Sequence, residues 1–209
     1  MININYFQSG TKIDYLYQYF YIFGIEPESI KLSDFIEQNR NYLNPDFLKV
    51  KLLTKYPNID NIESNINENI IINHCFPKGS KIILNNSQPP EEYFHFKLNN
   101  VLSFDPRNKF LYFTCIILFE PLQSYLDLSN QKINKNQKIP IEQLYVVKAL
   151  CFSSFESFPY ETRNLAKDLI SYVNSNKITI PIEKIIENII YGIPRPLRSN
   201  FCVKCTKSN

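Results

Sequence analysis

Two long apolar runs constrain the fold more than any other feature of this sequence. Residues 15–25 are aromatic or aliphatic at almost every position, and residues 110–119 are apolar except for one threonine. Successive side chains of a strand point to opposite faces of a sheet, so a strand that is apolar on both faces has to be covered on both. We therefore expect two long strands inside a sheet, with the first of them central. Neither run approaches the roughly 20 residues that cross a bilayer as a helix.

The overall composition suits a globular domain and excludes several classes of partner. The chain has 209 residues, of which 44% are hydrophobic and 21% are charged, which is enough to form a core. Its 23 basic and 20 acidic residues are interspersed, which argues against nucleic-acid binding and against a polybasic membrane anchor. Residues 1–6 lack the basic and apolar segments of a signal peptide. We expect a cytoplasmic protein without a transmembrane segment.

Three further strands follow from apolar patterning between turn-forming residues. Residues 70–76 are mostly apolar, residues 93–98 alternate between apolar and polar, and residues 144–152 are again mostly apolar. A turn is expected at 77–80, because its proline presets φ and its glycine accepts a positive φ. The strand at 93–98 should form a hairpin with the second long apolar run.

Helical spacing of apolar residues predicts three helices. One covers residues 28–43, and a second begins near Pro159. The third carries an isoleucine stripe over residues 182–190, with Gly192 as its C-cap and Pro194 preventing its continuation. Five strands followed by two C-terminal helices define an α+β fold on a mainly antiparallel sheet.

Two polar segments rich in asparagine predict loops, at residues 58–69 and 127–140. The second loop contains Lys132, Lys135 and Lys138, which we interpret as solvated side chains and not as a binding patch.

The five cysteines do not form a recognisable metal or disulfide motif. Three of them lie in apolar runs and are expected to be core residues. The other two form a C-x-x-C pair near the C-terminal end, which is half of a zinc site without a second half. An odd number of cysteines also argues against a disulfide-bonded secreted domain. The core cysteines are Cys75, Cys115 and Cys151, and the pair is Cys202 and Cys205.

Catalytic motifs are also missing from the sequence. Its four glycines are too far apart for a phosphate-binding loop, and no G-x-S-x-G motif occurs. His74 adjoins Cys75, and on the predicted strand their side chains point to opposite faces, so we interpret His74 as structural. The acidic residues Asp14, Glu91 and Glu92 lack the spacing of a catalytic pair. We predict no catalytic residue, no metal and no cofactor.

Alternate tyrosines at positions 15 to 21 place four aromatic rings on one face of the first strand. Such a face can stack nucleic-acid bases, but no basic patch accompanies it. We therefore expect Tyr15, Tyr17, Tyr19 and Tyr21 to pack within the sheet.

The order of these segments resembles the DENN domain family. The end of the first strand, Gly24 to Pro27, is similar to the family's opening strand, which ends in glycine, an apolar residue, an acid and proline. Tyr56-Pro57 and the segment 75–79 resemble the motif Tyr-Pro followed by Phe-Cys-Phe-Pro-x-Gly, with His74 in place of the first aromatic residue. Further matches are the strands at 93–98 and 109–115, the segment 148–155 against Lys-Ala-Leu-Cys-x-x-Ser, the Pro-Ile-Glu at 181–183, and the segment 193–197 against Val-Pro-x-Pro.

Two departures from the family's pattern stand between these matches. Asn99 replaces the usual threonine after the strand at 93–98, and residues 107–109 replace the usual Gly-x-Arg.

The resemblance implies a longin-like lobe at residues 12–176, with a five-stranded mainly antiparallel sheet flanked by helices and with insertions at the two polar loops. It further implies a crossover and the start of a second, central lobe at 177–209. Members of the family bind Rab-type small GTPases and promote GDP release, which requires no acid, base or metal from the exchange factor. They associate with vesicle membranes through their partners. The family's GTPase contacts match no motif here, so partner-binding residues remain unknown.

Two functions therefore remain open. The chain is part of a guanine nucleotide exchange factor, or it is a non-catalytic longin-like interaction module in membrane trafficking. The first predicts that the stripe at 182–190 is partly uncovered, because most of the second lobe that it would contact is missing. The second predicts a monodisperse protein that melts cooperatively.

Overall fold

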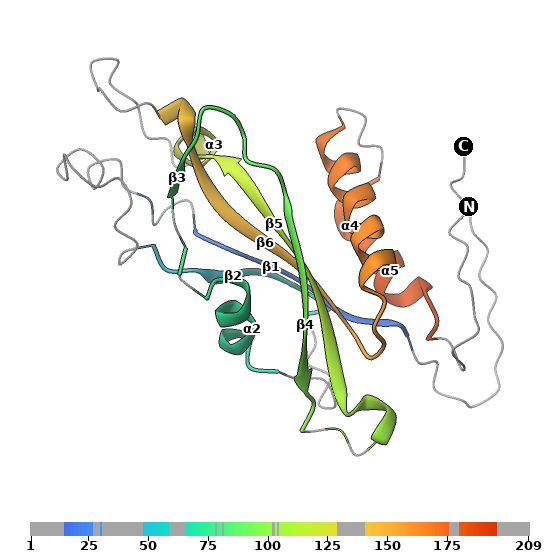
Figure 1. The fold of residues 1–209 in the computed structure, drawn as a ribbon. Coiled ribbons are helices and arrows are strands. Elements are labelled where there is room, and N and C mark those ends of the chain that lie inside the picture. The colour runs from blue at the N-terminus through green and yellow to red at the C-terminus, as the bar shows by residue number, and fades with distance from the viewer. Residues whose placement is uncertain are drawn as a thin grey trace.

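The computed structural model describes residues 15–26, 30, 48–58, 66–77, 79–80, 82–101, 103, 105–128, 141–175 and 180–195. These residues form one twisted sheet with helices on both of its faces (Figure 1). The strands are β1 (Tyr17–Gly24), β2 (Lys51–Tyr56), β3 (Ile82–Leu84), β4 (Glu92–Asn99), β5 (Phe110–Pro121) and β6 (Leu144–Ser154). The α-helices are α2 (Glu68–Cys75), α3 (Leu122–Leu128), α4 (Pro159–Asn174) and α5 (Ile182–Gly192), and single 3-10 turns are η4 (Pro106–Asn108) and η5 (Ile141–Gln143).

The predicted α+β class is confirmed. The strand order is β2-β1-β6-β5-β4, every pairing is antiparallel, and β3 adds to β6 beside the end of β1. The predicted hairpin of β4 with β5 is present, with Phe96 opposite Phe113. The expected central position of β1 is also confirmed, because β1 lies between β2 and β6.

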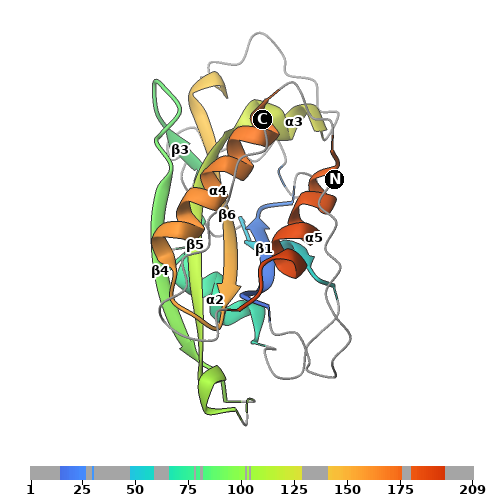
Figure 2. The same cartoon turned by 90° about the vertical axis from the view of Figure 1, so that its right-hand side faces the viewer.

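The two faces of the sheet carry separate apolar clusters. One cluster joins α2 to the sheet and contains Phe23, Ile71 and Phe113. The other joins α4 and α5 to the opposite face and contains Phe20 and Ile190. Figure 2 shows α4 and α5 running along that face, with α2 behind the sheet. Because helices pack on both faces of the sheet, the two apolar runs are covered on both sides, as their patterning predicts.

The isoleucine stripe of α5 packs against the chain's own sheet. Ile186, Ile189 and Ile190 are buried in the cluster that contains β1 residues, while Ile182 and Ile185 are half-buried. The helix ends close to the predicted point, but Gly192 is its last residue and Ile193 is the C-cap. Gly192 therefore does not cap the helix as predicted.

The predicted strand at 70–76 is wrong, because Glu68–Cys75 form helix α2. Asn67 caps this helix by accepting a hydrogen bond from the backbone of Asn69, at 3.0 Å. Ile71 and Cys75, four residues apart, are its buried positions. A short apolar run fits a strand and a helix equally well. The asparagines that predicted a loop at 58–69 include Asn67, which caps the helix. The predicted turn after it is confirmed, with Gly79 at a φ of 73°.

The prediction of a single tyrosine face is also wrong. The pairing of β1 with β6 shifts register between Tyr17 and Tyr19, which is a bulge. The Tyr17 hydroxyl therefore meets Thr162 Oγ1 of α4 at 2.9 Å, whereas Tyr19 and Tyr21 join the cluster on the α2 face. Tyr17, Tyr19 and Tyr21 are buried, so packing within the sheet is confirmed for these three. Tyr15 precedes β1, is half-buried and packs edge-on against the Tyr191 ring of α5.

Sequence patterning missed strands β2 and β3 and helix α3. The predicted loop at 127–140 starts inside the last turn of α3, and its remainder lies outside the described residues. The predicted helix at 28–43 also lies outside them, apart from Ile30, which is buried. No helix among the described residues has the length and hydrophobicity to cross a membrane.

Candidate functional site

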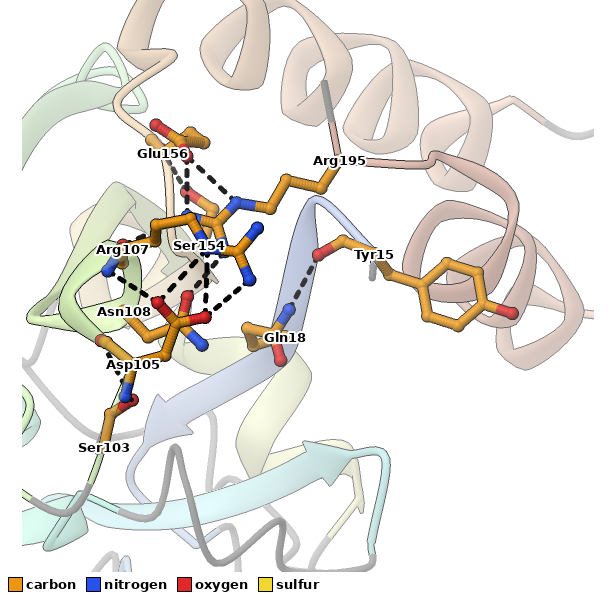
Figure 3. Close-up of polar contacts among 9 residues, drawn as sticks. All are labelled: Tyr15, Gln18, Ser103, Asp105, Arg107, Asn108, Ser154, Glu156 and Arg195. Carbon is orange, nitrogen blue, oxygen red and sulfur yellow. Dashed lines mark hydrogen bonds and ion pairs between the residues drawn. The ribbon is translucent and has the colours of Figure 1, made fainter. Parts of the chain in front are cut away.

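A buried arginine joins three segments at one end of the sheet (Figure 3). Arg195 follows α5, and its side chain is only 6% exposed. Its Nε and one terminal nitrogen donate to Glu156 Oε1, at 2.9 and 2.7 Å. Its other terminal nitrogen donates to Asn108 Oδ1 at 2.5 Å, and the guanidinium lies over the Phe155 ring, 5.2 Å from its centroid. We call Arg195, Glu156 and Asn108 the arginine junction.

The arginine junction fixes how the chain leaves α5. Asn108 belongs to η4 between β4 and β5, and Glu156 lies between β6 and α4. Arg195 also donates to the backbone carbonyl of Arg107, at 3.1 Å. A planar guanidinium can satisfy several acceptors at once, and burying its charge requires such partners. The segment after α5 is therefore tied to the hairpin tip and to the start of α4.

The hairpin tip beside the junction is itself ordered by charge. Arg107 donates to both carboxylate oxygens of Asp105, the shortest contact being 2.6 Å. These hydrogen bonds hold the pKa of Asp105 below its usual value. Ser103 Oγ accepts from the backbone N–H of Asp105 at 3.2 Å. The tip thus presents Asn108 to Arg195 in a fixed position.

Sequence reasoning identified both halves of the junction without joining them. In the sequence, residues 107–109 stand out only as a departure from the family's pattern, and Arg195 only as part of the motif at 193–197. The two prolines that flank Arg195 are a sequence signal for a restricted backbone at this position.

The three cysteines predicted to be core residues meet in space. Cys75 ends α2, while Cys115 of β5 and Cys151 of β6 are directly opposite each other in the sheet. Their Sγ atoms are 2.7 Å apart for Cys115 and Cys151, 3.4 Å for Cys75 and Cys151, and 3.8 Å for Cys75 and Cys115. All three are free thiols and buried. We call these residues the thiol triad.

The thiols of the triad have pKa values shifted in opposite directions. Contacts of Cys75 Sγ with the Cys115 and Cys151 thiols lower the pKa of Cys75. Burial raises the pKa of Cys115 and Cys151 well above the usual value. The three cysteines come together because of the strand register and the position of α2. Their burial was therefore predictable from the sequence, but their proximity was not. The C-x-x-C pair, Cys202 and Cys205, lies outside the described residues.

The other residues considered for catalysis do not form a reactive group. His74 is exposed on α2, its ring stacks on Phe96 at 4.6 Å, and its Nδ1 lies 2.8 Å from the Ile70 carbonyl. A structural role for His74 agrees with these contacts, although it lies on a helix and not on a strand. Glu91 hydrogen-bonds the Tyr93 hydroxyl. Asp14, Lys132, Lys135 and Lys138 lie outside the described residues.

A hollow of about 270 Å³ lies where the β4–β5 hairpin meets the start of α4. Its polar lining comes from His95, Lys97, Thr114 and Ser157. No carboxylate and no cysteine is among the described residues that line it, so it lacks an acid–base pair. The hollow can accept a small group or a side chain of a partner.

No protein-family model, curated protein or solved structure matches the chain. The resemblance to the DENN family therefore depends on the order of its motifs and remains a prediction.

Proposed function

We propose that the chain is the first lobe of a DENN-type regulator that promotes GDP release from a Rab-family small GTPase. The observation that supports this most is where the family-like residues lie. Gly24 ends β1, Tyr56 ends β2, and the Pro77–Gly79 turn follows α2. These segments follow successive elements in the order in which the family's motifs occur, and this order is what the proposal depends on.

The proposed activity is a difference in binding affinity and not a chemical reaction. An exchange factor binds the GTPase switch segments in a form that holds nucleotide and Mg²⁺ poorly, and it thereby shifts the GTPase toward that form. Such a protein acts through surfaces, so the arginine junction and the order of the sheet matter more than any single reactive group. The place of action is cytoplasmic, at vesicle membranes that the GTPase partner marks.

Within this proposal the arginine junction sets the direction of the crossover. Residues 177–209 correspond to the start of the central lobe, and Arg195 ties this segment to η4 and to the start of α4. A GTPase that contacts both lobes requires a fixed angle between them, because a loose connection would add an entropic cost to binding.

One observation favours the alternative, a non-catalytic interaction module. Three of the five isoleucines in the α5 stripe are buried against the chain's own sheet and only Ile182 and Ile185 are half-buried, whereas a lobe that lacks its neighbour is expected to leave the stripe more open. The described elements thus cover their main apolar faces without a second lobe.

Release of a fluorescent GDP analogue separates the two functions. Each member of a panel of Rab-type GTPases is loaded with the analogue, and its release is followed with and without the 209-residue protein. Faster release from one GTPase is expected for an exchange factor. Binding of a GDP- or GTP-loaded GTPase without faster release supports the module instead. If no member of the panel binds in any nucleotide state, the exchange-factor function is contradicted.

A further inference from the structure

The thiol triad places three potential metal ligands close together, and the proposed function gives them no role. The Sγ atoms of Cys75, Cys115 and Cys151 all lie within 4.8 Å of one another. Cys115 and Cys151 are fully buried, and Cys75 is 6% exposed. The triad belongs to the apolar cluster that also contains Phe76 and Phe113. A bound centre would therefore be shielded from water.

The separation of the sulfurs suits a centre that makes three bonds to sulfur. With bonds of about 2.3 Å, a three-coordinate centre holds its sulfurs about 3.4–4 Å apart, depending on how pyramidal it is. Cys75 already lies 3.4 Å from Cys151 and 3.8 Å from Cys115. Only the Cys115–Cys151 pair, at 2.7 Å, has to widen, by about 1 Å. A χ1 rotation of roughly 20° on each of the two cysteines, within their rotamer wells, supplies such a movement without a change in strand pairing.

The number of ligands and the surroundings restrict which centre fits. Structural zinc takes four ligands, but among the described residues no fourth ligand joins the triad. The nearest candidate in the sequence, His74, is exposed and stacked on Phe96. Monovalent copper on three thiolates would leave a net negative charge in an apolar core, which is costly. A trivalent centre on three thiolates is neutral.

We propose that Cys75, Cys115 and Cys151 form a three-thiol binding site for a trivalent thiophilic centre of the arsenite type. Arsenous acid exchanges its three hydroxyl groups for three thiolates, As(OH)₃ + 3 RSH → As(SR)₃ + 3 H₂O. Three S–H and three As–O bonds break, three As–S bonds and three water O–H bonds form, and no atom is oxidised or reduced. The reagent is uncharged near neutral pH, so it can enter an apolar site. Cys75, at the end of α2, is the least buried member and marks the point of entry.

Native mass spectrometry of the full chain with arsenite tests the site directly. The test protein carries Cys202→Ser and Cys205→Ser, because that pair could bind arsenite through two thiols. One adduct per chain is expected, with the mass of one arsenic minus three protons. A two-thiol adduct would instead keep one hydroxyl on arsenic and lose two protons. No adduct, or an adduct that keeps a hydroxyl, overturns the proposal.

A second variant identifies the ligands. In the same background, Cys75→Ala should convert the adduct to the form that keeps one hydroxyl, because Cys115 and Cys151 remain. An unchanged adduct would exclude Cys75 as a ligand and contradict the proposal. If this variant does not fold, X-ray absorption at the arsenic edge of the loaded test protein replaces it. Only the three cysteines of the triad remain in that protein, so three sulfur neighbours and no oxygen neighbour are expected, and an oxygen neighbour contradicts the site.

Discussion

At the scale of single residues, Arg195 shows how one buried charge can organise several surface segments. Its guanidinium has acceptors on η4 and in the loop before α4, so its charge is paired although its side chain is almost inaccessible. Removing one member of such a group leaves buried polar atoms without a partner. The free energy that this costs is larger than the net stabilisation that the hydrogen bonds contribute.

Replacing Arg195 with methionine should lower the free energy of unfolding by about 2–3 kcal/mol, because Asn108 Oδ1 and the Arg107 carbonyl lose a charged donor. Urea unfolding followed by circular dichroism measures this. Lys51→Met is the control. The Lys51–Glu26 pair is exposed and lies away from the junction, so its loss should lower the free energy of unfolding much less. Equal losses in the two variants would contradict a special role for Arg195.

Tyr93 should make stability depend on pH at the alkaline end. Burial and the hydrogen bond with Glu91 raise the pKa of Tyr93 from 10.0 to about 12. Because the unfolded chain loses this proton first, its stabilising contribution is complete below about pH 10 and is lost as pH rises to about 12. Tyr93→Phe should therefore flatten the fall in the urea midpoint across that window. Parallel curves for the two proteins would contradict the assignment.

At the scale of elements, sequence patterning predicted the long elements and failed on the short ones. The strands β1, β4, β5 and β6 and the helices α4 and α5 each contain enough residues for their period to be evident. Helix α2 has eight residues, like β1 and β4, but they make only about two helical turns, against four repeats of a strand. Strand β3 has three residues, so neighbours decide the structure of both elements. The arginine junction and the thiol triad require strand register and loop contacts between distant residues, which one sequence does not encode locally.

The cap of α2 provides a test of the corrected assignment. Asn67→Ala should lower the free energy of unfolding by about 1 kcal/mol, because the Asn67 side chain accepts the Asn69 backbone hydrogen bond. Asn69→Ala is the control, since it changes an exposed side chain of the same helix and leaves that backbone donor in place. Urea unfolding compares the two. An equal effect would indicate that residue 67 does not cap a helix.

At the scale of the whole molecule, the two apolar clusters share the strands β1, β5 and β6, so helices on both faces should unfold together. Ile190 of α5 is 1% exposed in the cluster opposite α2. Ile190→Ala should lower the free energy of unfolding by about 2–5 kcal/mol and shift a single transition. Ile180→Ala, at a position 47% exposed, should change it little. Far-ultraviolet circular dichroism and tyrosine fluorescence both follow the unfolding. Two separate transitions would contradict a single cooperative unit.

The position of β6 has a consequence for the order of events during synthesis. This strand is the last of the described strands, yet it lies between β1 and β5 and pairs with both. On a ribosome, β1 is made before β6 and cannot meet this neighbour until residue 154 has emerged, so one edge of β1 stays unpaired until then. Such pairings between distant residues form slowly and leave apolar strands open to aggregation. The sheet of this protein therefore closes from its edges, and its centre is completed last.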